Sequence, residues 1–169
     1  ACPSTITIDG ELFTPSNGNY TVLNEYGGGA FSLPDEINEW SSAFINNLNL
    51  TNMSLNIVAN ISGAAPAMNI ILSNNSITNV SKINQQTQVM QINVYDKNIE
   101  FYNYSDSVLK PIAFGKPNVQ SGINQIQLNK NCLDSNCNVQ LTMNTQNVLN
   151  FTFTGKNKTR SIGFESIKY

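Results

Sequence analysis

Apolar and polar residues alternate along many short stretches of this chain. The clearest alternation runs through residues 5–8, 54–61, 90–95, 99–102, 139–143 and 149–153. Successive side chains of a β-strand point to opposite faces, so a period of two predicts strands with one buried and one exposed face. Clusters of Asp, Asn, Gly and Pro separate these stretches and are typical of turns. The pattern predicts an all-β fold, an antiparallel β-sandwich or jelly roll.

One segment departs from the alternation and predicts a short helix near residues 35–48. Its apolar residues are spaced by three, four and one positions, which fits a single helical face. They are Ile37, Trp40, Phe44, Ile45 and Leu48. The helix would cap an open end of the sandwich with Trp40 anchored in the core, and a ligand platform is the alternative role for Trp40.

The length of the chain fits one domain, which we predict to span residues 1–169. Gly27, Gly28 and Gly29 form its most flexible point and could set residues 1–26 apart as an N-terminal arm. The same glycines are not followed by the Lys and Ser or Thr of a phosphate-binding loop.

Nine Asn-x-Ser/Thr triplets occur along the chain, and seven carry an apolar middle residue. In a strand, the Asn and the Ser or Thr share one face while the middle residue takes the other. The triplets therefore predict N-glycans on the outer faces of a secreted sandwich. Compositional accident is the alternative, because chance placement gives roughly half as many triplets in so Asn-rich a chain. The predicted acceptors are Asn19, Asn49, Asn52, Asn60, Asn74, Asn79, Asn103, Asn150 and Asn157.

Charge and hydropathy narrow the choice of partners and compartment. Charged residues make up 12% of the chain and the net charge is −2, so no field attracts nucleic acid. No apolar run approaches the roughly 18 residues that cross a bilayer as a helix. The chain opens at Ala1 without a Met, as a signal-cleaved secreted protein does. We therefore expect a secreted or cell-surface location.

Three cysteines add to this picture. Cys132 and Cys137 bracket a short polar loop, and a disulfide between them is predicted for an oxidising compartment, with two free thiols as the alternative. Cys2 is then left over. An odd cysteine in a secreted protein points to intermolecular pairing, although a free thiol or a cysteine beyond this sequence is also compatible with it.

Catalytic and metal-binding signals are weak. The chain has no histidine, which excludes Ser-His-Asp and Cys-His catalysis. Its carboxylates form no recognisable pair, so no enzyme activity and no cofactor are expected. Calcium is a weak candidate: residues 134–138 begin like a calcium loop but lack its later Gly and Glu, and an Asx-rich turn is the alternative. Further carboxylates expected at strand ends are Asp9, Asp96 and Asp106.

Three tyrosines fall on the non-core phase of neighbouring predicted strands. Tyr95, Tyr102 and Tyr104 could form an aromatic strip on an outer face, where sugar rings would stack, or they could pack across strands.

Two functions from different classes fit these features. The favoured hypothesis is a secreted, N-glycosylated structural or adhesion protein that contacts other copies of itself or surface proteins. Residues 5–8 would pair with the sheet edge of a neighbour, and Cys2 would lock that contact. The alternative is a lectin-like carbohydrate-binding module that uses Trp40 or the tyrosines, with calcium as a further option.

Overall fold

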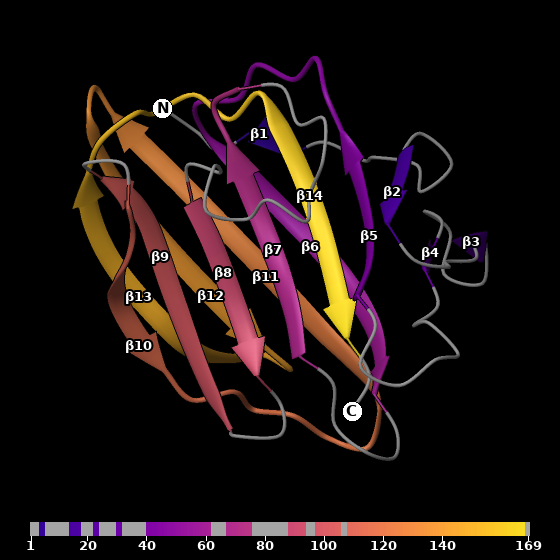
Figure 1. The fold of residues 1–169 in the computed structure, drawn as a ribbon. Helices are drawn as coiled ribbons and strands as arrows, with labels where there is room; N and C mark the ends of the chain where they lie inside the picture. The colour runs from indigo at the N-terminus through magenta and orange to yellow at the C-terminus, as the bar shows by residue number, and fades with distance from the viewer. Residues whose placement is uncertain are drawn as a thin grey trace.

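The computed structural model of this chain describes residues 4–5, 14–17, 22–23, 30–31, 40–61, 67–75, 88–93, 97–105 and 108–167. Within these ranges the chain forms strands β1 to β14 and no helix. The longer strands build two sheets that face each other as the layers of a sandwich (Figure 1). The predicted all-β antiparallel sandwich is therefore confirmed.

The five-stranded sheet, sheet A, has the strand order β1-β6-β11-β12-β13. Its strands are β1 (Ser4–Thr5), β6 (Met53–Ile61), β11 (Gly122–Leu133), β12 (Asn136–Met143) and β13 (Gln146–Thr154). Neighbouring strands are antiparallel except at β1, where Ser4 and Thr5 pair in parallel with Met53 and Ser54. Ser4 and Thr5 are thus already paired with a strand of the same molecule.

The seven-stranded sheet, sheet B, has the order β10-β9-β8-β7-β14-β5-β2 and is antiparallel throughout. Its strands are β2 (Thr14–Asn17), β5 (Trp40–Ile45), β7 (Ala67–Ser73), β8 (Gln88–Asn93), β9 (Asn98–Ser105), β10 (Val108–Gly115) and β14 (Ser161–Ile167). A separate pair joins β3 (Val22–Leu23) to β4 (Ala30–Phe31). One domain and an arm at residues 1–26 stay predictions.

Alternate residues from both sheets meet in one apolar core. On β12, for example, Cys137, Val139, Leu141 and Met143 are buried, whereas the residues between them are partly exposed. Aromatic side chains join the layers, because the ring of Phe101 from sheet B lies 4.6 Å from that of Phe151 in sheet A. Burial of this apolar layer is the main stabilising contribution to the fold.

The predicted helix near residues 35–48 is wrong over Trp40–Ile45, which form strand β5. This strand pairs with β14 on one side, where Trp40 lies opposite Ile167, and with β2 on the other, where Phe44 lies opposite Thr14. Pairing on both sides engages the backbone groups that a helix would use, so tertiary context overrides the local apolar spacing. Residues 35–39 lie outside the described ranges.

The two sheets approach closely at one edge, where β10 ends sheet B and β13 ends sheet A. Gly115 on β10 makes this approach possible. A Cβ added there would meet the backbone oxygen of Val148 at 2.5 Å, a separation that real Cβ atoms do not show. Glycine is therefore required at this crossing of β10 over β13.

One charged side chain lies inside the core. Lys130 on β11 is 1% exposed, and its neighbours in register are the buried Met53 and Val139. Its amine donates hydrogen bonds to Thr159 Oγ1 at 3.0 Å and to the backbone oxygen of Asn157 at 3.2 Å. Burial lowers the pKa of the Lys130 amine from 10.5 to about 8, because desolvation disfavours its charged form.

The predicted disulfide between Cys132 and Cys137 is present. It links the two strands of the β11–β12 hairpin at a directly opposed pair of residues. Cys137 is 1% exposed and Cys132 packs against the core, so the bridge lies on the inner face of sheet A. The disulfide crosslinks a hairpin whose two strands are already held together by the hydrogen bonds of the sheet.

We predict that the free energy of unfolding rises as the pH increases from about 8 to 10.5. Over that window the unfolded chain binds a proton at Lys130 that the folded chain has released, so the folded state gains on the order of 3 kcal/mol. The rise should be absent in K130M, in which the apolar side chain does not titrate. Urea denaturation of both proteins at each pH measures the difference, and an equal rise in both would contradict the assignment to Lys130.

Loss of the disulfide should lower the free energy of unfolding by about 2 kcal/mol, because the bridge closes only a short loop in the unfolded chain. Reduction of the native protein and the double variant C132A/C137A should both show this loss in urea denaturation. The double variant retains Cys2 and serves as the control, since a reductant should not change its midpoint. If the reductant leaves the urea midpoint of the native protein unchanged, the disulfide does not contribute to its stability.

Candidate functional site

The outer face of sheet B carries a row of side chains that runs across strands β8, β9 and β10. Gln91 lies opposite Glu100, and Glu100 lies opposite Phe114. Directly paired residues of antiparallel strands share a face, so all three point to the same side. The β-bulge at Ile112 sets this register, because it leaves Ala113 packed against the core and turns Phe114 outward. The row therefore brings an amide, a carboxylate and an aromatic ring together.

Tyr102 completes this group, because it lies two positions after Glu100 on β9 and on the same face. Its hydroxyl donates a hydrogen bond to a carboxylate oxygen of Glu100. This bond orients both groups and leaves lone pairs on the carboxylate free to accept further hydrogen bonds. Glu100, Tyr102 and Gln91 are each half-buried. They are held by the sheet and still open to solvent.

Phe114 differs from its neighbours in being 68% exposed. A phenyl ring on the edge strand of a sheet is free to stack against an apolar surface of a ligand. Exposure on this face falls toward the middle of sheet B, where Val89 is 1% exposed and Ile71 is fully buried. The accessible part of the face is thus its β9–β10 side, where Phe114 and Glu100 lie.

The structure places some of the predicted ligand residues at this site. Tyr102 lies in it, as the alternation predicts, but its role stays a prediction. Tyr104 lies in β9, where its backbone pairs with that of Leu109 in β10, and Trp40 lies in β5 on the far side of sheet B. The side chains of Tyr104 and Trp40 fall outside the described part. Tyr95 is also outside it. Phe114 and Gln91 were not identified from the sequence, because only the strand register aligns them with Glu100.

The predicted calcium segment does not form an ion-binding loop. Asp134 and Ser135 make a two-residue hairpin turn, since Leu133 pairs with Asn136. From Asn136 onward the segment is a strand, so alternate oxygens point away from one another. Across the described ranges, no three His, Cys, Asp or Glu side chains cluster as metal ligands would. Asp9, Asp96 and Asp106 lie outside those ranges.

The outer face of sheet A has a different chemistry, because no charged residue occurs at its outward positions on β6, β11, β12 and β13. Amide side chains dominate it, and some donate hydrogen bonds to neighbouring side chains or backbone groups. Asn138 Nδ2, for example, donates to Asn150 Oδ1 at 3.1 Å and to the backbone oxygen of Phe151 at 3.2 Å. The outward positions include Ser54, Asn56, Val58, Ile123, Gln125, Gln127, Asn129, Asn131, Asn136, Asn138, Gln140, Thr142, Asn150, Thr152 and Thr154.

The predicted glycan acceptors differ in orientation. Asn150 has the predicted arrangement, because it is exposed on β13 while Phe151 packs against the core. Asn103 has the reverse arrangement. It pairs with the buried Gln88, and its amide faces Gly155 at the end of sheet A, so it lies on the inner side of β9.

The other acceptors lie in loops, on strand β6 or outside the described part. Asn49 is exposed, whereas Asn52, Asn74 and Asn157 are half-buried. Asn52 Oδ1 accepts a hydrogen bond from the backbone N–H of Cys132, and Asn157 Nδ2 donates to the backbone oxygen of Asp134. Asn60 lies in β6, where its backbone pairs with that of Ile123 in β11. Asn19, Asn79 and Cys2 lie outside the described residues.

Comparison with solved structures identifies proteins of the same fold. The carbohydrate recognition domain of Emp46p, in its metal-free form, aligns with a TM-score of 0.66 at 14% identity over 93% of this chain and 81% of that one. The exoplasmic/lumenal domain of VIP36, in a Ca²⁺/Man-bound form, aligns with a TM-score of 0.65 at 12% identity over 96% and 81%. A Bacillus subtilis protein of unknown function with a galectin-like fold aligns with a TM-score of 0.64 at 9% identity over 93% and 83%.

No protein-family model matches the sequence, and no curated protein matches it either. At the identities seen among the solved structures, the similarity shows the galectin-like β-sandwich fold alone, and function has to be argued from the residues of this chain. The described part also contains no helix that could cross a membrane.

We predict that Asn150 carries an N-glycan when the protein is made in a secretory host, and that Asn103 does not. A glycan on Asn150 extends into solvent, whereas one on Asn103 would have to fit between the sheets of the folded chain. Glycopeptide mass spectrometry measures occupancy at each residue, and N150Q should remove one glycan from the intact mass while N103Q leaves it unchanged. A fully occupied Asn103 in the folded protein would contradict the orientation of β9.

Proposed function

We propose that this chain is a carbohydrate-binding, lectin-like domain whose ligand lies on the outer face of sheet B. The observation that carries the proposal is the hydrogen-bonded pair of Tyr102 and Glu100, flanked by Gln91 and by the exposed ring of Phe114. Saccharides present hydroxyl groups in several directions and patches of C–H on their ring faces. A carboxylate, an amide and an aromatic ring on one face match both kinds of group.

The fold supports the same proposal. Solved structures that share it include a carbohydrate recognition domain and a Ca²⁺/Man-bound lumenal domain. In the proposed contacts, Glu100, Tyr102, Gln91 and Phe114 reach the saccharide directly, without a bridging metal ion. Calcium stays a prediction for Asp9, Asp96 and Asp106, and a chelator added to the binding assay tests it.

Adhesion through addition of the N-terminal strand to a neighbouring sheet is supported less well. That hypothesis uses residues 5–8 as a strand added to a neighbouring molecule, but Ser4 and Thr5 already pair with β6 of their own sheet.

A binding role without catalysis remains part of the proposal, and recovery of the bound glycan chemically unchanged would test it. A secreted or lumenal location is also proposed, with the disulfide in its support, since such bonds persist in oxidising compartments.

The proposal predicts that a glycan array probed with the purified protein gives hits that depend on Phe114 and Glu100. F114A should weaken binding about tenfold or more through loss of stacking, and E100A by about 10- to 100-fold through loss of charged hydrogen bonds. Y102F should cost less, because it removes a single hydroxyl and retains the ring.

L133A is the matched control for F114A, because Leu133 is an apolar residue, 78% exposed, that lies on the other sheet, at the β11–β12 hairpin of sheet A. It should bind as the native protein does. A folded native protein that binds no glycan, with or without calcium, would end the proposal. Equal binding by F114A and L133A would move the site away from sheet B.

A further inference from the structure

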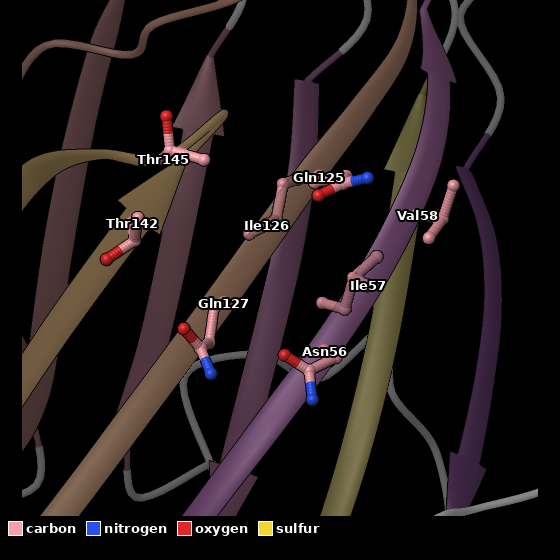
Figure 2. A pocket seen from close by; sticks show the side chains of 8 residues that line it. All are labelled: Asn56, Ile57, Val58, Gln125, Ile126, Gln127, Thr142 and Thr145. Carbon is pink, nitrogen blue, oxygen red and sulfur yellow. The ribbon is translucent and has the colours of Figure 1, made fainter.

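We propose that a depression on the outer face of sheet A is a second binding site, specific for a neutral saccharide. The depression has a volume of about 300 Å³ and lies over strands β6, β11 and β12. Figure 2 shows its lining side chains on these strands and on the turn that follows β12. It is on the opposite face of the sandwich from Glu100 and Phe114, so it is separate from the site on sheet B.

Three polar side chains meet across the depression because of the strand register. Asn56 on β6 lies opposite Gln127 on β11, and Gln127 lies opposite Thr142 on β12. Gln125 lies one outward position along β11, opposite Val58, which is 39% exposed. The floor is therefore polar with one apolar corner, the combination that a sugar ring and its hydroxyls require.

Most of the hydrogen-bonding capacity of these side chains is unused. Gln127 Nε2 donates to Ser54 Oγ at 3.3 Å, which holds that amide in place. Among the described residues, the side chains of Asn56, Gln125 and Thr142 make no hydrogen bond. Each amide offers both donors and acceptors, so a ligand can replace water at these groups without losing hydrogen bonds.

The chemistry of the face selects the class of ligand. No outward position of sheet A around the depression is charged, so neither an anionic nor a cationic ligand would find a counter-ion there. A peptide is disfavoured because extended peptides bind at sheet edges, whereas β6, β11 and β12 are inner strands whose backbones are already paired. Amides and hydroxyls in a shallow, open site fit a neutral saccharide best.

Backbone strain at the rim of the depression supports a binding role. The turn between β12 and β13 consists of Asn144 and Thr145, which have φ values of 51° and 67°. The left-handed region is unfavourable for a β-branched residue, and glycine is the usual choice at such a hairpin position. Thr145 nevertheless occupies it, and its side chain lines the depression. Strain that persists at the rim of a site is expected where the side chain contributes to binding.

The strain provides a sharp test. T145G should raise the urea midpoint, because glycine relieves the left-handed backbone, and should weaken saccharide binding at least about fivefold through loss of the side chain. The matched control is D134G, at the turn between β11 and β12, where Asp134 has a φ of 54°. D134G should also raise the midpoint but leave binding unchanged, since Asp134 does not line the depression.

Binding is measured by NMR titration of the native protein with methyl mannoside, lactose, maltotriose and chitotriose, with sialyllactose as the charged comparison. At least one neutral probe is expected to shift the side-chain amide signals of Asn56, Gln125 and Gln127. F114A and E100A should leave these shifts intact, so failure here and failure of the site on sheet B are distinguishable. The proposal is overturned if no neutral probe shifts these amides, if T145G binds as D134G does, or if the signals shift only with protein concentration, which would mark contact between copies.

Discussion

The apolar contact between the sheets, with Phe101 packed against Phe151 and Phe153, is the constraint on which the rest of the structure depends. The ring centroids of Phe101 and Phe153 are 5.7 Å apart, and those of Phe151 and Phe153 are 6.2 Å apart. Once these residues point inward, the two-residue period sends Glu100 and Tyr102 outward from one sheet and Asn150 outward from the other. A slip of one residue in β9 would bury Glu100 and Tyr102, and a slip in β13 would bury Asn150; either slip would expose core residues, so the core determines which residues both outer faces present.

The architecture could be predicted from the sequence because sandwich strands carry their burial pattern locally. Val139, Leu141 and Met143 alternate with polar residues, and burial follows that alternation. The disulfide also had a local signal in the short spacing of Cys132 and Cys137. Residues 40–45 had no such signal, because their apolar spacing also fits a helical face, and only pairing with β14 and β2 makes them a strand.

The candidate sites were less predictable, because they depend on which strands become neighbours. Tyr102 and Glu100 could be placed on an outer face from β9 alone. The contribution of Phe114 could not be predicted, since a bulge at Ile112 reverses the local alternation and the register then aligns Phe114 with Glu100. The inward orientation of Asn103 was not predictable for a related reason, because an Asn-x-Ser/Thr triplet in a strand does not reveal whether its Asn or its middle residue faces the core.

The close crossing at Gly115 has a consequence for assembly. The unpaired edges of β-sheets invite further strands, and long exposed edges promote polymerisation. Here the terminal strands of both sheets, β10 and β13, lie against each other, so each obstructs the approach of a foreign strand to the other. Growth of this protein into a continuous sheet is thereby disfavoured on that side, and a side chain at residue 115 would open both edges at once.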